Sequence, residues 1–411
     1  MAGPTQTLAA VARQEWGRLT SLLLARFRRL DLVEDALGDA FEAAARRWPT
    51  DGTPDNPAAW LLTTARRRIL DRLRAEQRHQ RKMPLLVTES ERSDSVAAMA
   101  DPGDLVEDDL LRLVLMCAHP ALPAEGASAL ALRLVLGVST YDLARLFLVS
   151  EPTMAARITR AKKKIVGAGI PFAIPDESAL PDRLDSVART AYLAFTAGYA
   201  PGSGPDLLRA ELAGEAIRLV RVVRSRFPDE PVLGALLALT LLQHSRRDAR
   251  ISTTGSLVLL ADQDRTLWRR DEIEEALALL RSLPQAVTPL SASYAVQAWI
   301  AAEHATAATA EDTRWDRIVS HYDSLVTIDP SPAARLARAV AVAEASGPAA
   351  GLDALQGIDI PGSHRPASVR AELLSRLGRS SEARAAYDEA IDLCRNEAEL
   401  AYLRDRQASL G

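Results

Sequence analysis

The sequence contains few cysteines and no long apolar stretch. Cys117 and Cys394 are its only cysteines, so a disulfide framework is excluded and a reducing compartment is expected. No apolar run reaches the roughly 18 residues that a membrane-spanning helix needs. The N-terminal stretch MAGPTQTLAAVARQEW also lacks the basic and apolar regions of a secretory signal. We therefore expect a cytoplasmic protein that has no membrane partner.

Lysine is nearly absent, and its placement reveals an uneven distribution of charge. The four lysines all lie before residue 165, and the net charge of the chain is −4. That total argues against a polyanion-binding protein until the charge is divided by segment. Residues 1–82 and 111–170 each carry +5, whereas residues 83–110 and 171–411 each carry −7. Such an asymmetry points to nucleic acid as a partner of the two basic segments.

Helix is the regular structure that the sequence pattern favours throughout. Ala and Leu dominate, apolar residues recur at spacings of three and four, and the alternation typical of strands is scarce. Clusters of Pro, Gly, Ser and Asp interrupt this pattern at several places. We therefore predict an all-α protein with four parts: a helical bundle (8–82), a flexible acidic linker (83–107), a small helical bundle (108–170) and a long helical domain (180–411).

Residues 31–48 are predicted to form an amphipathic helix with one apolar and one acidic face. Its apolar positions follow the helical repeat and should face the core: Val33, Leu37, Ala40, Ala44 and Trp48. Its acidic positions lie on another side: Glu34, Asp35, Asp39 and Glu42. Two interpretations remain open, because acidic residues stabilise the start of any helix and could also form a docking surface for a basic partner.

A second helix, predicted over 56–81, combines a buried stripe with a dense cluster of arginines. The stripe consists of Leu62, Ala65, Ile69 and Leu73. The arginines crowd the rest of the surface: Arg66, Arg67, Arg68, Arg72, Arg74, Arg78 and Arg81. Guanidinium groups bind phosphates in bidentate fashion and stack on bases, which favours a nucleic-acid surface. The alternative is a solvated face partly neutralised by Asp71 and Glu76. Trp60 fits either the core or a stack on an unpaired base.

Residues 139–166 have the pattern of a helix-turn-helix motif. A short helix over 140–147 precedes a turn, and Ser150 is then a suitable N-cap for a second helix. The inward positions of that second helix are Met154, Ile158, Ala161 and Ile165. The neighbouring stripe, about 100° round the helix, consists of Thr153, Arg157, Arg160 and Lys164. Such a stripe is typical of a recognition helix, although basic residues also suit the C-terminal end of any helix.

These modules, in this order, resemble an extracytoplasmic-function (ECF) sigma factor of the sigma-70 family. VEDALGDAFEAAARRWP resembles sigma region 2.2, NPAAWLLTTARRRILDRLR resembles regions 2.3–2.4, and SEPTMAARITRAKKK resembles region 4.2. Gly38 and Ala155 depart from the family pattern, which usually has Gln and a basic residue at these positions. The resemblance covers residues 8–170.

The resemblance implies a role for each of the three motifs. The residues expected to dock on the clamp helices of the RNA polymerase β′ subunit are Glu34, Asp35, Asp39 and Glu42. Those expected to open the −10 element and bind its non-template strand are Asn56, Trp60, Arg66, Arg67, Arg68, Arg72 and Arg74. Those expected to read the −35 element as duplex are Glu151, Thr153, Arg157, Arg160, Lys162, Lys163 and Lys164. The acidic linker would lie in the nucleic-acid cleft of the polymerase as a mimic of RNA.

The remaining chain resembles the ECF group that carries a long C-terminal extension with tetratricopeptide-like repeats. The similar stretches are 108–122, 168–175, 260–270, 311–352 and 370–400, the last with the spacing of a tetratricopeptide helix pair. The implied partners are core RNA polymerase (β′ clamp helices and β flap), promoter DNA, and a protein partner or an intramolecular contact of the extension. No enzymatic activity, cofactor or metal is expected, and Cys117 and His119 are interpreted as a helix-end pair.

Two other classes of protein remain as alternatives. A ligand-responsive helix-turn-helix regulator would bind DNA without polymerase, and it would not need the motifs within residues 31–82. A helical-repeat scaffold protein with an incidental basic N-terminus would not depend on Arg157 and Arg160 for any effect on transcription. Within the sigma-factor interpretation, the extension would either regulate the sigma core or help it to bind polymerase.

Overall fold

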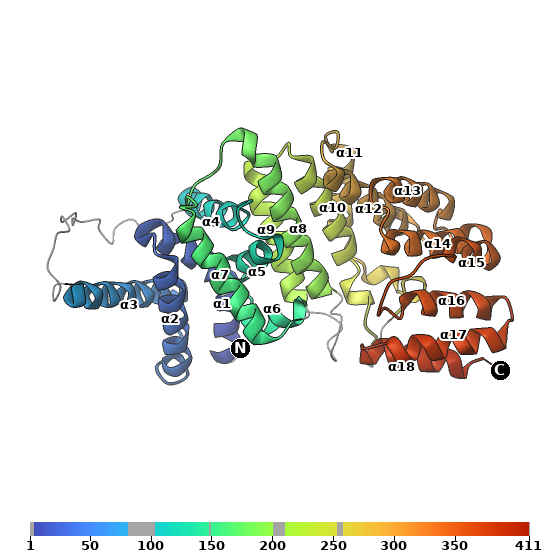
Figure 1. Cartoon of the computed structure of the whole chain (residues 1–411), viewed down its shortest axis with the longest axis horizontal. Helices are drawn as coiled ribbons and strands as arrows, with labels where there is room; N and C mark the ends of the chain where they lie inside the picture. The colour runs from blue at the N-terminus through green and yellow to red at the C-terminus, as the bar shows by residue number, and fades with distance from the viewer. Residues whose placement is uncertain (1–3, 81–102, 148, 200–209, 253–257, 411) are drawn as a thin grey trace. The chain divides into compact units, whose positions relative to one another are not determined.

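The protein is helical throughout the part that the structure describes (Figure 1). The computed structural model describes residues 4–80, 103–147, 149–199, 210–252 and 258–410, and no strand occurs among them. The all-α prediction is therefore confirmed. Most of the predicted acidic linker lies outside the described residues. The chain divides into two compact units, Met1–Thr190 and Ala191–Gly411.

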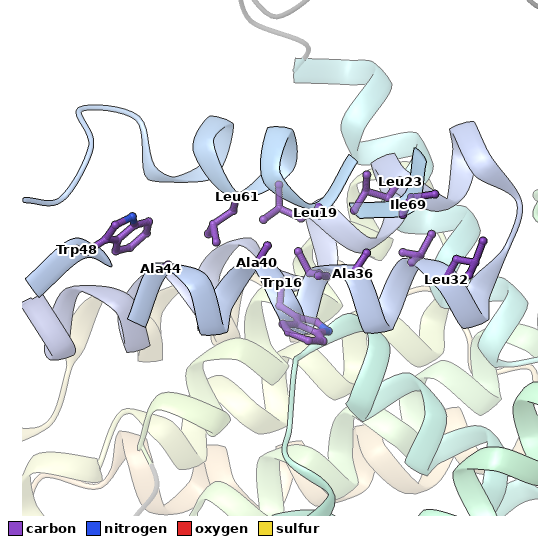
Figure 2. Close-up of a cluster of buried hydrophobic side chains, with 13 residues drawn as sticks. Trp16, Leu19, Leu23, Leu32, Ala36, Ala40, Ala44, Trp48, Leu61 and Ile69 are labelled. Carbon is purple, nitrogen blue, oxygen red and sulfur yellow. The ribbon is translucent and has the colours of Figure 1, made fainter. Parts of the chain in front are cut away.

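The first unit begins with a bundle of three helices, α1 (Pro4–Phe27), α2 (Leu30–Asp51) and α3 (Pro57–Gln80). The predicted apolar face of α2 is confirmed, because all five of its residues are buried. Figure 2 shows the alanines of this face and Trp48 lying along α2, with Leu61 and Ile69 of α3 opposite them. The small alanine side chains let the neighbouring helices approach α2 closely, so the three helices share one core.

Two details of this bundle differ from the prediction. Helix α2 continues through Pro49 to Asp51, where the sequence predicts a break, and Gly52 then ends it with a φ of 86°. Proline is tolerated there because it lies in the last turn of the helix. The backbone hydrogen bond that its missing N–H cannot make is then followed by only two helical residues. In α3, Ala65 and Ile69 are fully buried as predicted, and so is Leu61. The predicted Leu62 and Leu73 are half-buried against the same core. The buried stripe of α3 is therefore rotated by one position from the predicted one at its N-terminal end.

A second bundle within the same unit contains the predicted helix-turn-helix motif. It consists of α4 (Gly103–Cys117), α5 (Ala124–Val135), α6 (Thr140–Leu146) and α7 (Glu151–Gly167). Helix α4 begins inside the stretch predicted as linker. Helix α7 packs on both α5 and α6, which buries its apolar face. Helix α1 contacts α4 and α5, so the two bundles of the first unit pack against each other.

Gly17 is the point of closest approach between α1 and α5. A Cβ atom added there would collide with the backbone carbonyl of Val135, whereas one added at Gly38 of α2 would meet nothing within 4 Å. We expect Gly17→Ala to lower the free energy of unfolding by about 1–3 kcal/mol. Gly38→Ala, the matched control, should raise it by roughly 0.5–1 kcal/mol because alanine favours helix. Urea unfolding measures both, and equal effects of the two substitutions would contradict the α1–α5 contact.

Helix α8 (Leu180–Tyr199) follows a short 3₁₀ turn, η2 (Glu177–Ala179), and links the two units. Its first half is tied to the second bundle. Buried Arg183 donates a hydrogen bond of 2.7 Å to the carbonyl of Leu115, and the hydroxyls of Thr190 and Ser128 lie 3.1 Å apart. The first compact unit therefore ends inside a helix, later than the predicted domain start at 180.

The second unit continues with helices that pack mainly on their neighbours along the chain. They are α9 (Ala210–Arg226), α10 (Pro231–His244), α11 (Arg270–Arg281), α12 (Pro289–Thr306), α13 (Trp315–Ile328), α14 (Pro332–Ser346), α15 (Pro348–Leu355), α16 (Arg365–Arg376), α17 (Ser380–Leu393) and α18 (Glu397–Ala408). Three short 3₁₀ turns lie between α10 and α11: η3 (Arg247–Ala249), η4 (Leu260–Asp262) and η5 (Arg265–Leu267). Contacts between consecutive helices are typical of a repeat array. In the described parts of the chain, no helix is both long and apolar enough to cross a membrane.

The helix pair predicted over residues 370–400 is confirmed. Helices α16 and α17 pack against each other and are joined by a tight turn at Gly378, whose φ of 72° favours glycine. Within this pair the hydroxyl of Tyr387 donates to Glu372, which also pairs with Arg406 of α18. These bonds connect the last three helices.

Candidate polymerase and nucleic-acid interface

Helix α7 has the cap and the buried face that the sequence predicts. The Ser150 side chain accepts a hydrogen bond from the backbone amide of Thr153, which fixes the N-terminus of the helix. All four predicted inward residues are buried. Burial of one face leaves the neighbouring stripe of α7 at the surface, as a recognition helix requires.

The predicted −35 residues lie on that surface, but their side chains differ in how far they are exposed to solvent. Exposed side chains are those of Glu151, Thr153, Arg160, Lys163 and Lys164. The side chain of Arg157 is only 21% exposed, because it pairs with Glu125 at 2.8 Å and lies over the ring of Phe147. Arg157, Arg160 and Lys164 line a cleft of about 490 Å³, which Glu125 of α5 also borders. This cleft is therefore basic along α7 and acidic at a single position.

The predicted −10 residues lie at the N-cap of α3 and at several positions round that helix. The Asn56 side chain caps the helix by accepting a hydrogen bond of 3.0 Å from the amide of Ala59. Arg67 and Arg68 are exposed, and Arg66 is half-buried. Arg74 pairs with Asp71 at 3.3 Å, so the neutralisation considered from the sequence occurs at that position.

Trp60 belongs partly to the core. Its ring packs edge-on against the ring of Trp48, with the centroids 5.7 Å apart, and the residue is half-buried. The core interpretation of Trp60 is therefore supported. A role in stacking on a base stays a prediction, since part of the side chain remains at the surface.

Three of the four predicted polymerase-docking acids lie at the surface. Glu42 pairs with Arg46 one turn along α2. Asp35 and Asp39 both pair with Arg72 of α3, at 3.2 and 2.9 Å. Arg72 is a predicted −10 residue, so the structure joins two predicted sites through one guanidinium group. Exposed pairs of this kind contribute little to stability, so they can exchange for intermolecular partners at low cost.

Glu34 differs from the other acids because it is buried between the two bundles. Its carboxylate accepts a 3.0 Å hydrogen bond from Arg133 of α5 and pairs with the ammonium group of Lys162 of α7. Arg133 also lies over the ring of Trp16. A buried carboxylate needs such partners. The sequence did not predict that Arg133 and Trp16 lie beside Glu34, because no local pattern relates these residues to it.

Two groups of residues outside this interface could be considered as metal ligands. Cys117 lies fully buried at the end of α4, where burial raises the pKa of its thiol, and His119 accepts a backbone hydrogen bond from Ala121. The helix-end interpretation of this pair therefore fits the structure. In the second unit, donor atoms of His364, Cys394 and Glu399 lie within 4.8 Å of one another, a cluster that the sequence did not reveal.

The pKa of His304, in α12 of the second unit, is strongly lowered. Burial and the nearby charges of Arg246 and Arg265 lower its pKa to about 4. The unfolded chain takes up this proton near pH 6.5, whereas the folded chain does not. Stability due to this residue is therefore present above pH 6.5 and is lost as the pH falls towards 4.

The lowered pKa of His304 predicts that the folded protein loses stability in acid. Between pH 7 and pH 5, protonation of the unfolded state at this one site should cost the full chain about 2 kcal/mol of unfolding free energy. Urea unfolding at both pH values should show a smaller loss for His304→Gln than for the unaltered protein. Equal losses in the two proteins would contradict the neutral, buried state of His304.

Comparison with known proteins gives three family matches. Residues 12–79 match sigma-70 region 2, residues 112–165 match sigma-70 region 4, and residues 183–283 match a family of unknown function (DUF6596). An uncharacterized protein of Rhizobium meliloti (strain 1021) is 44% identical over 386 residues, which cover 93% of this chain and 90% of that protein. No solved structure matches the chain.

The two sigma-70 matches coincide with the two bundles of the first unit. Region 2 falls on α1–α3 and region 4 on α4–α7, which includes the capped helix α7. Domains of this kind indicate a transcription regulator that binds DNA, and not an enzyme. The chain therefore belongs to the sigma-70 family, and its region 2, region 4 and C-terminal DUF6596 domain are consistent with an ECF-like sigma factor that carries a C-terminal extension.

Proposed function

We propose that this protein binds core RNA polymerase in the cytoplasm and directs transcription initiation at promoters with specific −10 and −35 elements. The observation that carries the proposal is the geometry of α7: a capped helix with four buried apolar residues and a basic stripe at the surface. Phosphate contacts from this stripe supply affinity for duplex DNA, and base-edge contacts supply specificity.

Region 2 is proposed to act in two steps. Asp35, Asp39 and Glu42 first meet the basic clamp helices of the polymerase β′ subunit. Arg66, Arg67 and Arg68 of α3 then bind the −10 strand once it is unpaired. Unstacking bases costs a few kcal/mol each, and phosphate contacts with base stacking offset that cost.

The contact between the bundles implies that region 2 and region 4 separate on the promoter. The −10 and −35 elements lie about 25 base pairs apart, or roughly 85 Å of B-form duplex at 3.4 Å per base pair. In the structure, by contrast, Glu34 of region 2 touches Arg133 and Lys162 of region 4 directly. We infer that binding to polymerase exchanges these ion pairs for intermolecular ones, which frees Glu34 for docking and Lys162 for phosphate.

The extension is proposed to be a tetratricopeptide-like domain that regulates the sigma bundles or binds polymerase or another protein. Its neighbour-to-neighbour helix packing supports this proposal. Because the first half of α8 packs on region 4, a truncation that tests the extension should retain residues 1–199. Promoter-specific transcription unchanged by that truncation would contradict both roles.

Transcription with purified components tests the proposed function. The full chain and core polymerase together should give defined transcription starts on genomic fragments, and neither component alone should do so. Native gel shifts provide the contrast with a polymerase-independent regulator, since a sigma factor should bind its promoter well only with core polymerase. Tight promoter binding by the chain alone would favour the autonomous regulator.

A further inference from the structure

The second unit contains a cavity where stretches far apart in the sequence meet. It encloses about 640 Å³, a volume within the range of small-molecule sites. Five elements form its walls: η4 with Leu260, η5 with Arg265, α12 with His304, α13 with Trp315 and α14 with Ala337. A second cavity of about 500 Å³ shares Leu260, His304 and Ala337 with the first, so the two spaces adjoin.

Two guanidinium groups lie at this place. The acids that line the same spaces are exposed, so water screens their charge: Glu311 and Glu344 at the first cavity and Asp329 at the second. Arg265 lies 4.6 Å from the ring centroid of Trp268, and Arg246 lies 6.0 Å from the centroid of the same ring. Arg265 lines the first cavity and Arg246 the second. Burial is the main cause that lowers the pKa of Arg265 and of His304. Arg246 repels the charge on Arg265 and lowers both pKa values further, whereas Glu311 raises that of Arg265. An anion held between them would relieve this repulsion.

Arg265 is also held in place before any ligand arrives. One of its terminal nitrogens donates to the carbonyls of His304 and Ala307, at 2.7 and 2.8 Å. A fixed guanidinium loses little side-chain entropy when it binds an anion, so its remaining donors are preorganised. The carboxylate Glu344, on another wall, is paired with Arg376 and therefore offsets little of the positive charge.

The rest of the lining is suited to an apolar body. Trp315 packs edge-on against the imidazole of His304, with the ring centroids 5.2 Å apart. Tyr322 lines both cavities. Its surroundings contain little water, and this burial raises the pKa of its hydroxyl. Val340 and Ala341 of α14 complete this side.

We propose that this cavity binds a small organic anion, with a carboxylate between Arg246 and Arg265 and an aromatic or aliphatic body against Trp315 and Tyr322. The extension would then be a ligand-binding module and not only a protein-docking surface. The proposal does not depend on the role of the sigma bundles, because binding to the extension can be measured without transcription.

Calorimetric titration of the full chain with naphthalene-2-carboxylate tests the proposal, with naphthalene-2-carboxamide as its neutral counterpart. We expect the carboxylate to bind at least tenfold more tightly than the amide, and Arg246→Gln to remove most of that difference. Ala337→Phe should abolish binding, because Ala337 lines both cavities. Ala345→Phe, at an exposed position of the same helix, should leave binding unchanged.

Folding of each variant is checked by circular dichroism, and Ala337→Leu replaces Ala337→Phe if the larger side chain disrupts the helix. Equal affinity for carboxylate and amide would overturn the assignment of an anion. Binding that survives filling of the cavity would overturn the assignment of the site. Failure of the carboxylate to bind at millimolar concentration would overturn the small-molecule proposal in favour of a protein partner.

Discussion

Replacement of both Arg157 and Arg160 by alanine is expected to reduce promoter-directed transcription by at least roughly 30-fold. Each arginine that contacts base edges is worth about 1–3 kcal/mol of recognition, and the two lie on the same stripe of α7. The measurement is the yield of defined transcripts from the full chain with core polymerase on its mapped promoter. Affinity for core polymerase should not change, because α7 takes no part in the proposed clamp contact.

The two arginines differ in their surroundings, so the two single substitutions should have different effects on the folding of region 4. Arg160 is exposed, so Arg160→Ala is a surface change with little effect on folding. Arg157 pairs with Glu125 and lies over Phe147, so Arg157→Ala also removes a contact within region 4. Arg281→Ala, at an exposed arginine of α11 in the second unit, removes one positive charge outside region 4. A loss of transcription in that control equal to the loss in the double variant would refute the recognition role.

The second large effect concerns docking on polymerase. Asp35→Asn with Asp39→Asn should weaken binding to core polymerase by roughly 10- to 100-fold, or about 1.4–2.8 kcal/mol. These substitutions keep the size of both side chains and remove only their charge. Binding is measured with the purified full chain and core polymerase in the absence of DNA, at moderate salt.

Arg72→Gln is the matched control, because it breaks the same two ion pairs from the other side. If the acids dock on polymerase, this variant should bind core polymerase at least as well as the unaltered protein. It should instead lower the fraction of open promoter complexes, since Arg72 is a predicted −10 residue. Asp71→Asn, which removes an exposed acid of α3, should affect neither measurement. Weakened core binding in Arg72→Gln would show that the ion pairs, and not the acids themselves, matter.

Local patterns in the sequence correctly predicted the cap of α7 and the buried faces of α7 and α2. The inward face of α7 and its Ser150 cap follow from a repeat of 3.6 residues and from the chemistry of a helix start, both of which act within a few residues. The same repeat identified the buried face of α2. The prediction for α3 was displaced by one position at Leu62, because a run of apolar residues there leaves the choice of the buried one to the neighbouring helices.

Contacts between elements were decided only by the tertiary structure. The sequence predicts Glu34 as a docking acid and Lys162 as a phosphate contact, but their pairing with each other depends on how α2 and α7 are oriented within the first unit. The pairing of Arg72 with Asp35 and Asp39 likewise depends on the distance between two helices. Such distances are fixed by side-chain packing across the chain, on which the local repeat carries no information.

The sequence by itself determined that this is an all-α protein with a capped amphipathic helix α7 and with sigma regions 2 and 4 in that order. It did so because amphipathic periodicity, helix caps and clusters of charge are local properties. The structure alone decided which charges are free and which are already paired. It also brought Arg246, Arg265 and His304 to two adjoining cavities, since groups so far apart in sequence meet only when helices pack.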